Sequence, residues 1–376
     1  MEFQKLNGRT KPKLPNLFAT SLFFILSFSN CSEAPSEESS FNQEEEVQSI
    51  EFYGNTQGTT FAVICNDKID ITHEEIVDLL ADFDMALSAW VEESTLSKFN
   101  AASPGKFQYN DPNNYFNRCY LLSSELYSIT KGAFDPTLYP IIDAWGFYRK
   151  NNTKLDSNTV DSLMAFTGFR SGHFVYGLKE DTLGIKQPAN NINKYTPQVK
   201  LDFNGIAQGL AVDVICELLN ERGAKNYYVE IGGEIRISGS NREGNDWRIG
   251  IDKPIENSTA EDREITEIIQ LTNCGIATSG SYRNFFESDQ RTYSHTINPK
   301  TGWPVSHKLI SATVVSKTCA EADALATACM VMGPEESIAF FQNDTLNLGE
   351  IYLIYENNKG RTETYFSPGF QDFIVK

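Results

Sequence analysis

Two oxygen-bearing side chains stand one helical turn apart in the carboxyl-terminal third of the sequence. Asp323 and Thr327 belong to the segment Ala-Glu-Ala-Asp-Ala-Leu-Ala-Thr, at positions i and i+4 of an expected helix whose face is otherwise small and apolar. A buried carboxylate and hydroxyl are costly unless a partner satisfies them. Mg²⁺ would do so, because it takes oxygen ligands and is commonly completed by substrate phosphates. The spacing thus makes a magnesium site one interpretation of this helix.

Four other segments combine polar residues and glycine with apolar residues, and three of them also have a purely structural interpretation. Residues 132–137 (GAFDPT) could be a helix exit, since Asp-Pro-Thr starts turns readily. Residues 201–209 (LDFNGIAQG) could be a strand end, with Asn204 capping the next helix. The backbone N–H groups of residues 277–280 could converge on an anion. Residues 295–302 (HTINPKTG) could be a plain hairpin turn with a structural histidine.

Several common catalytic signatures are missing. The sequence has no G-x-G-x-x-G after an expected strand, no G-x-x-x-x-G-K-[ST], no G-x-S-x-G and no H-E-x-x-H. Rossmann, P-loop, α/β-hydrolase and zincin sites are therefore unsupported. Gly232-Gly233-Glu234 is followed by Ile235-Arg236, which breaks the cyclic-dinucleotide cyclase pattern, and we interpret the glycine pair as a bulge between two strand halves.

Helices and short strands alternate irregularly along the chain. Thr72 and Glu75 form a capping box that starts a helix ending near residues 88–90. The interspersed order predicts an α+β fold with mixed or antiparallel sheets and excludes regular βαβ winding. The other expected helices span 112–131, 157–167, 206–222 and 320–332, with Gly132, Gly223 and Gly333 as stops, and the expected strands span 49–53, 59–65, 226–238, 247–251, 264–272, 310–316 and 350–356.

The charge balance argues against nucleic-acid binding. The 376 residues carry 32 basic and 50 acidic side chains, a formal net charge of -18, and no basic patch interrupts this excess. Such a surface repels phosphate backbones. With 40% hydrophobic residues, the composition is that of a folded globular chain.

The amino terminus has the features of an export signal. Basic residues between positions 5 and 13 precede the apolar run 17–28, which is shorter than the roughly 20 residues needed to span a bilayer. The segment resembles a bacterial lipoprotein signal in which residues 1–30 are removed and Cys31 is lipidated, although Phe28 and Asn30 depart from the usual pattern. An uncleaved anchor helix is the alternative. Either interpretation leaves the rest of the chain outside the cytoplasm.

Residues 31–47 are expected to be an acidic flexible tether, and residues 48–376 a single folded domain. The tether is rich in Glu and Ser and has too few apolar residues to offset the entropy of ordering. The cysteines after Cys31 show no C-x-x-C and no metal-type spacing. Most lie in apolar runs, which favours buried free thiols over disulfides.

Taken together and in order, the segments resemble the ApbE family of FAD:protein FMN transferases. They cover residues 54 to 333, and many family members are periplasmic lipoproteins, which suits the amino terminus. The segments that carry the resemblance are GTTFAV, LSKFN, GAFDPT, LDFNGIAQGLAVD, EIGGE, WRIGI, GIATSG, HTINPKTGWPV and AEADALATACMVMG.

The resemblance implies a role for individual residues. Asp323, Thr327 and the backbone carbonyl of Gly205 would hold Mg²⁺. His295 would be the base, since it is the only histidine in the matched motifs and its ordinary pKa lies near physiological pH. The FAD would be lined by Gln57, Trp90, Ala133, Phe134, Asp135, Asp202, Gln208 and Ile297.

The implied reaction is Mg²⁺-dependent transfer of FMN from FAD to a Thr or Ser hydroxyl of a partner protein, with release of AMP. The family implies partners such as membrane redox-pump subunits or exported electron carriers. The enzyme would face the periplasm of a bacterium, anchored in the membrane by lipid at Cys31. Two alternatives remain: an exported FAD pyrophosphatase and a non-catalytic flavin-binding lipoprotein. The departures from the family pattern are Gln208 for Lys, Asn298 for Asp, and Ala326 for an acidic residue.

Overall fold

The computed structural model describes residues 49–148, 155–169, 172–181, 184–254, 264–281, 285–288, 291–294 and 296–375. Residues 47–376 form one compact unit. The expected signal, the expected tether with Cys31, and the candidate base His295 lie outside the described residues. Within the described ranges, no helix combines the length and the apolar character that crossing a membrane requires.

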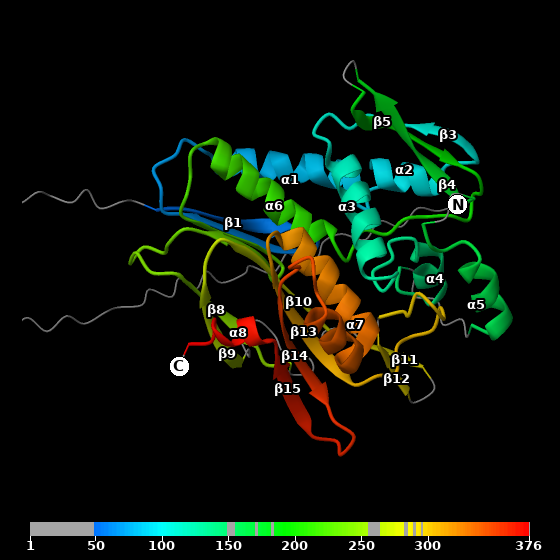
Figure 1. Cartoon of the computed structure of the whole chain (residues 1–376). Coiled ribbons are helices and arrows are strands. Elements are labelled where there is room, and N and C mark those ends of the chain that lie inside the picture. Colours follow the sequence, from blue (N-terminus) through cyan, green and yellow to red (C-terminus); the bar gives the residue numbers. More distant parts are fainter. Residues whose placement is uncertain are drawn as a thin grey trace, which may run out of the picture. The chain divides into compact units, whose positions relative to one another are not determined.

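A large sheet forms the centre of this unit (Figure 1). Among the described residues it has eight strands in the order β1-β2-β6-β7-β10-β13-β14-β15, and every pairing is antiparallel. The α+β prediction is confirmed, and of the two sheet types it allowed, the described strands use the antiparallel one. The strands are β1 (Ile50–Thr56), β2 (Thr59–Cys65), β6 (Tyr227–Ile231), β7 (Glu234–Ser238), β10 (Cys274–Gly280), β13 (Leu309–Ser316), β14 (Glu350–Glu356) and β15 (Thr362–Phe366).

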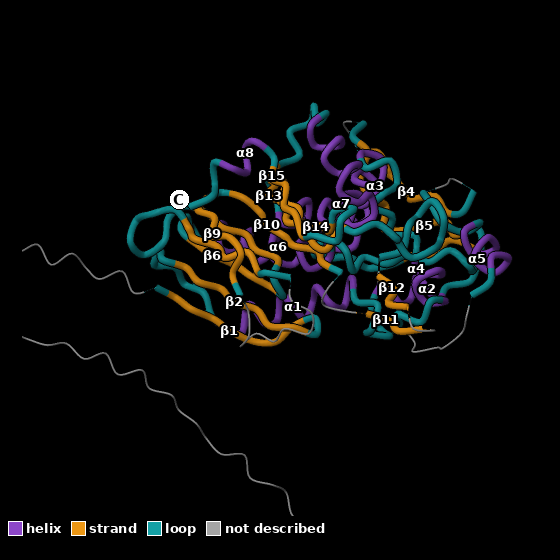
Figure 2. Tube along the Cα trace, turned by 90° about the horizontal axis from the view of Figure 1, so that it is seen from below, coloured by secondary structure: helices purple, strands orange, loops and turns teal. Residues whose placement is uncertain are grey.

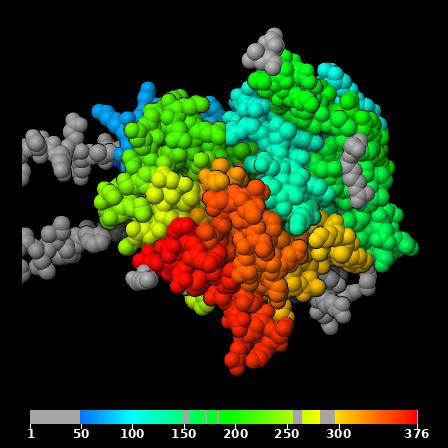
Figure 3. All heavy atoms as spheres, viewed as in Figure 1, coloured from blue at the N-terminus to red at the C-terminus, as the bar shows by residue number. Residues whose placement is uncertain are grey.

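Helices cover one face of the sheet, and α1 and α6 run side by side across it (Figure 1). The helix α7 packs on β10 and β13 and also contacts α6 and α3, and the surfaces of α3 and α7 adjoin in Figure 3. Their apolar faces form the main core together with the inward side chains of the strands. The helices are α1 (His73–Leu87), α2 (Thr95–Ala101), α3 (Tyr115–Ile129), α4 (Tyr139–Ala144), α5 (Ser157–Met164), α6 (Ala207–Glu221), α7 (Cys319–Gln342) and α8 (Pro368–Gln371).

A second apolar cluster lies on the opposite face of the sheet. It joins strand residues to the hairpin of β8 (Trp247–Asp252) and β9 (Ile265–Leu271) and to α8. Smaller sheets lie outside this layer (Figure 2): β3 (Gly105–Gln108), β5 (Lys186–Lys194) and β4 (Phe174–Glu180) form one, and β11 (Phe285–Ser288) pairs with β12 (Arg291–Ser294).

The structure corrects two local predictions and bears out a third. Gly232 and Gly233 do not form a bulge: both have positive φ (62° and 110°) and make the two-residue turn between β6 and β7, which only glycine adopts easily. Asn204 does not cap α6, whose N-cap is Ile206 without a side-chain hydrogen bond. Gly333 (φ 79°, ψ 178°) is non-helical and ends the first helical segment of α7, as predicted, and a second segment follows from Pro334 to Gln342.

Other predictions are confirmed. The capping box is present, with Thr72 Oγ1 accepting from the Glu75 N–H and Glu75 accepting from the Thr72 N–H. The cysteines of the described residues are free, and all except Cys274 are buried. The sequence did not predict several elements, among them α2, β3, β4, β5, β10 and β15; β5, with nine residues, is the longest strand of the described part of the chain.

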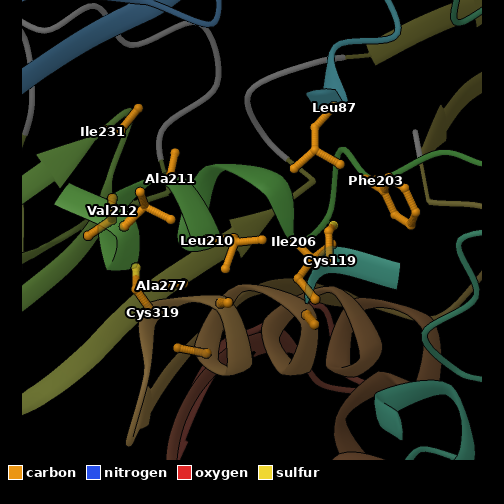
Figure 4. Packing of buried hydrophobic residues seen from close by; sticks show 14 of the residues in the cluster. Leu87, Cys119, Phe203, Ile206, Leu210, Ala211, Val212, Ile231, Ala277 and Cys319 are labelled. Carbon is orange, nitrogen blue, oxygen red and sulfur yellow. The ribbon is translucent and has the colours of Figure 1, made fainter. Parts of the chain in front are cut away.

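The first turn of α7 sits in a tight space between β10 and α6 (Figure 4). A Cβ atom added at Gly275 of β10 would overlap the Cys319 nitrogen and the Thr318 carbonyl. One added at Gly209 of α6 would come within 2.5 Å of the Cys319 carbonyl oxygen. Because backbone atoms cannot move aside as side chains do, these two positions must lack a side chain for α7 to pack where it does.

Replacing Gly275→Ala should therefore destabilise the protein by about 2 kcal/mol, since the added methyl group forces α7 away from β10. Gly172→Ala is the matched control, because a Cβ there meets nothing within 4 Å. Chemical denaturation followed by circular dichroism measures both. Equal stability of the two variants would contradict the tight packing of α7.

Candidate functional site

A cavity of about 560 Å³ opens between the β1–β2 turn, the end of α1 and the start of α6. This volume suits a small-molecule ligand. Three of the predicted FAD residues, Gln57, Trp90 and Gln208, line it together. The full lining is Gln57, Gly58, Phe83, Asp84, Leu87, Ser88, Ala89, Trp90, Val91, Asn204, Ala207 and Gln208.

A network of serine hydrogen bonds shapes the loop that presents Trp90. Ser88 Oγ accepts from the backbone N–H groups of Trp90 (3.1 Å) and Val91 (3.2 Å). The Ser88 carbonyl in turn accepts from the hydroxyls of Ser94 (2.6 Å) and Ser97 (3.1 Å) at the start of α2. The loop is thereby held to two helices, while Trp90 is 69% exposed. A rigid backbone with an open aromatic face is suited to stacking on a flat ring.

Tyr148 continues this aromatic surface, although sequence reasoning did not identify it. Its ring centroid lies 5.1 Å from that of Trp90 and 4.6 Å from that of Tyr139, on which it stacks. Its hydroxyl accepts from Asn204 Nδ2 at 2.9 Å. Burial and the neighbouring Asp202 raise the pKa of the Tyr148 phenol, so it stays protonated. The only sequence signal was the aromatic run Trp-Gly-Phe-Tyr after α4.

The two aspartates predicted to face FAD lie on adjacent segments. The Asp202 N–H donates to the Pro136 carbonyl at 2.7 Å, which joins the Asp-Pro-Thr turn to the segment that leads into α6. Asp202 Oδ1 accepts from the Asn204 N–H (2.8 Å), and burial raises the pKa of this carboxyl. Asp135 Oδ1 accepts from both the N–H (2.8 Å) and the hydroxyl (2.6 Å) of Thr137.

Two further residues predicted to line the FAD, Ala133 and Phe134, are buried in the main core. Neither these two residues nor Asp135 and Asp202 belong to the described cavity lining.

The motif Leu-Ser-Lys-Phe-Asn at α2 fixes the segment that carries Asp202. Asn100 Nδ2 donates to the Leu201 carbonyl (2.8 Å), and Asn100 Oδ1 accepts from the Leu201 N–H (2.7 Å). Lys194 is fully buried, and its Nζ donates to the carbonyls of Phe99 (2.8 Å) and Asn100 (3.3 Å) at the end of α2. Burial, and secondarily Lys200, lowers the pKa of Lys194 to about 8.

The three predicted metal ligands come together where α6 and α7 meet. Asp323 and Thr327 lie on successive turns of α7, and a Cβ added at Gly205 would come within 2.9 Å of Thr327 Oγ1. Asp323 Oδ2 accepts from the Gly209 N–H of α6 at 3.1 Å. Asp323 is 5% exposed, and burial raises its pKa to about 7.

These donors fit a hard cation. A carboxylate, a hydroxyl and a backbone carbonyl are the oxygen ligands that Mg²⁺ prefers, and three of them leave positions for water or phosphate oxygens. Within the part of the chain that the structure describes, no cluster of three or more His, Cys, Asp or Glu side chains could hold a metal. A softer transition metal, which prefers imidazole or thiolate ligands, therefore has no comparable site among the described residues.

The segment after His295 forms a hairpin turn, which is the structural interpretation given above for residues 295–302. Ile297 bridges to Pro304, and the Gly302 N–H donates to the Asn298 carbonyl at 2.8 Å. Ile297 is buried in a small cluster with Ile141 of α4 and Val160 of α5, so its side chain packs in that cluster and not in the cavity lining.

The anion interpretation of residues 277–280 is wrong. They lie inside β10, which pairs with β13 from Gly275 to Gly280. Successive N–H groups of a strand point to opposite sides, so they cannot converge on one ion.

The ApbE family model matches residues 57–350. This chain belongs to the ApbE family. It is 34% identical over 326 residues to the FAD:protein FMN transferase of Haemophilus influenzae, covering 84% of this chain and 89% of that one. The enzyme of the same name from Vibrio cholerae is 34% identical over 346 residues, covering 89% and 95%. The prediction that the chain is a transferase is confirmed.

Solved structures agree with this assignment. The flavin transferase ApbE from Vibrio cholerae superposes with a TM-score of 0.71 at 31% identity, covering 87% of this chain and 99% of that chain. The apo form of the Pseudomonas stutzeri flavinyl transferase ApbE gives a TM-score of 0.71 at 30% identity, covering 87% and 96%. The α+β architecture described above is therefore that of the family.

The buried Lys194 predicts a specific dependence of stability on pH. Its folded pKa of about 8 lies below the ordinary value of 10.5, so the unfolded chain binds more protons between these two pH values. The unfolding free energy of the wild type, relative to Lys194→Met, should rise by up to about 3 kcal/mol from pH 8 to 10.5. Denaturant titrations across this range measure the difference, with the exposed Lys179→Met as control. If the difference in unfolding free energy between the wild type and Lys194→Met does not change with pH, the lowered pKa of Lys194 is contradicted.

Proposed function

We propose that this ApbE-family enzyme transfers FMN from FAD to a Thr or Ser hydroxyl of a partner protein in a Mg²⁺-dependent reaction that releases AMP. The observation that best supports the proposal is that residues 204–209 contact both the cavity and the predicted metal ligands. Asn204, Ala207 and Gln208 line the cavity, while Gly205 and Gly209 lie against Thr327 and Asp323. A ligand that fills the cavity would thus lie against the same segment that contacts the oxygen cluster.

The parts of FAD match this arrangement. Its isoalloxazine ring would stack in the cavity against Trp90, whose indole is open to solvent. Its pyrophosphate would lie at the start of α6, where the positive end of the helix dipole favours anions. Asp202 and Asp135 would accept hydrogen bonds from donors on FAD.

The transfer step is a substitution at phosphorus. The partner's hydroxyl oxygen forms a bond to the FMN phosphorus, the bond to the bridging oxygen breaks, and AMP leaves with that oxygen. His295 would accept the hydroxyl proton. Mg²⁺, when bound, would neutralise charge that develops on the phosphate oxygens. The products are a phosphoester-linked flavin and AMP.

Three substitutions reduce charge around this site relative to the family pattern. Gln208 offers an amide where Lys is usual, and a Cβ at Gly232 would lie 3.0 Å from Gln208 Nε2, so the amide reaches the β6–β7 turn. Ala326 is fully buried, and Asn298 lies in the hairpin turn. Asp323 and Thr327 keep the oxygen ligands that the proposal needs, with weaker electrostatic attraction for the cation than a second acid would give.

The reaction would take place outside the cytoplasm. The export signal and Cys31 support a lipid-anchored enzyme facing the periplasm, and the acidic tether of residues 31–47 would hold the folded unit away from an anionic membrane. Its partner would then be a membrane redox-pump subunit or an exported electron carrier.

The test is intact-protein mass spectrometry of an exported electron-carrier domain after incubation with residues 32–376, FAD and Mg²⁺. We expect the carrier to gain the mass of FMN less one water at a Thr or Ser, together with one AMP per adduct. Asp323→Ala should reduce the rate by a hundredfold or more, on the order of the loss for a transition-state electrostatic contact. Glu336→Gln, an exposed carboxylate on the same helix, should leave the rate unchanged.

Two results would contradict the transferase. FMN and AMP without any adduct, on several carriers, would identify an FAD pyrophosphatase. FAD that remains intact but bound would identify a flavin-binding lipoprotein.

A further inference from the structure

The carboxylate of Asp213, on α6, caps the start of α7. Its Oδ1 accepts from the Cys319 N–H at 2.9 Å, and its Oδ2 accepts from the Ala320 N–H at 2.9 Å. These are two of the free N–H groups at the amino-terminal end of any helix. Thr318 Oγ1 accepts from a third, the Glu321 N–H at 3.2 Å. The first turn of α7 is therefore fixed by the side chain of its own N-cap residue, Thr318, and by that of Asp213 from α6.

Arg236 of β7 completes the arrangement. Its Nη1 donates to Asp213 Oδ1 at 2.7 Å, and the Asp213 side chain is only 4% exposed. A buried carboxylate is costly alone, and here it has three charge-assisted or dipolar donors. Asp213 thus connects three elements: α6, α7 and a strand of the central sheet.

The contacts between α6 and α7 have a matching spacing. Asp213 meets Cys319 and Ala320, while Gly209, one turn earlier on α6, meets Asp323, one turn later on α7. The two helices therefore run in opposite directions along this contact. Because one turn on each helix separates the two contacts, the Asp213 cap and the Asp323 contact form only in the same register.

The backbone of α7 is closely packed around this contact. Gly209 and Gly275 lack side chains where Cys319 passes, and Leu210 and Ile206 of α6 point towards α7 (Figure 4). Dense packing of this kind has few alternative arrangements. The cap and the packing therefore fix the same position of α7, and any shift of α7 along α6 would move Asp323 and Thr327 relative to Gly205.

We propose that Asp213, held by Arg236, is a positioning residue for the metal site: it fixes the register of α7 on α6 and thereby brings the oxygens of Asp323 and Thr327 to Gly205. This inference rests on the proposed function, which takes those three residues as the ligands of Mg²⁺. Asp213 does not touch the metal or the substrate. Its role is to hold the helix that carries two of the ligands.

The test is the affinity of residues 32–376 for Mn²⁺, a paramagnetic substitute for Mg²⁺, measured by electron paramagnetic resonance of the free ion without FAD or acceptor. Asp213→Asn keeps the shape and removes the charge, and we expect about tenfold weaker binding, the usual size of an indirect loss at a metal site. Arg236→Gln leaves the cap in place and should cause a smaller loss, about threefold. Activity at saturating metal should return to within about twofold of the wild type in both.

The controls separate positioning from general stability. The control variant Glu217→Gln removes the carboxylate one turn further along α6. This carboxylate pairs with Arg118 of α3 at 2.6 Å and does not hold α7. The Glu217→Gln variant should therefore bind Mn²⁺ as the wild type does. All affinities are measured where circular dichroism shows each variant fully folded. A residue that only adds stability would leave the affinity of the folded protein unchanged.

Each outcome decides one claim. Unchanged Mn²⁺ affinity in Asp213→Asn and Arg236→Gln, with binding lost in Asp323→Ala, would overturn the positioning role alone. If Asp213→Asn does not fold, wild-type affinity in Arg236→Gln is sufficient to overturn it. Wild-type affinity in Asp323→Ala would instead overturn the metal site of the proposed function.

Discussion

The close contact between α6 and the first turns of α7 is the constraint on which the rest of the site depends. It requires Gly209, whose missing side chain lets the Cys319 carbonyl approach, and whose N–H donates to Asp323. One backbone position therefore serves both packing and chemistry. The same contact brings Gly205 to Thr327, and it leaves Asn204, Ala207 and Gln208 on the side of α6 that faces the cavity.

The remaining elements hold this pair of helices against the sheet and complete the cavity. The strands β10 and β13 support α7 from below, and Gly275 allows it to lie directly on the backbone. The helix α2 fixes the segment before α6 through Asn100, which bonds both backbone groups of Leu201. The serine network from Ser88 then sets the loop that carries Trp90. Local hydrogen bonds thus position the aromatic wall, and helix packing positions the oxygens.

The features that could be predicted from the sequence are those that depend on local periodicity or capping. The capping box at Thr72, the paired strands around the Gln57–Gly58 turn, and the i, i+4 spacing of Asp323 and Thr327 are of this kind. Sequence reasoning missed β10, because Gly275 to Gly280 is rich in small polar residues, and its strand conformation is imposed by pairing with β13. Tyr148 and Asp213 were also missed as parts of the site, since their roles arise from contacts with distant segments that no single-sequence pattern records.

The most direct measurement is a crystal structure of residues 32–376 with FAD and Mg²⁺. We expect a cation bound by the Asp323 carboxylate, the Thr327 hydroxyl and the Gly205 carbonyl, with a phosphate oxygen among its other ligands. We also expect the flavin ring in the cavity against Trp90. A cation bound elsewhere, or a flavin ring outside this cavity, would contradict the claim that the packing of α6 on α7 builds the site.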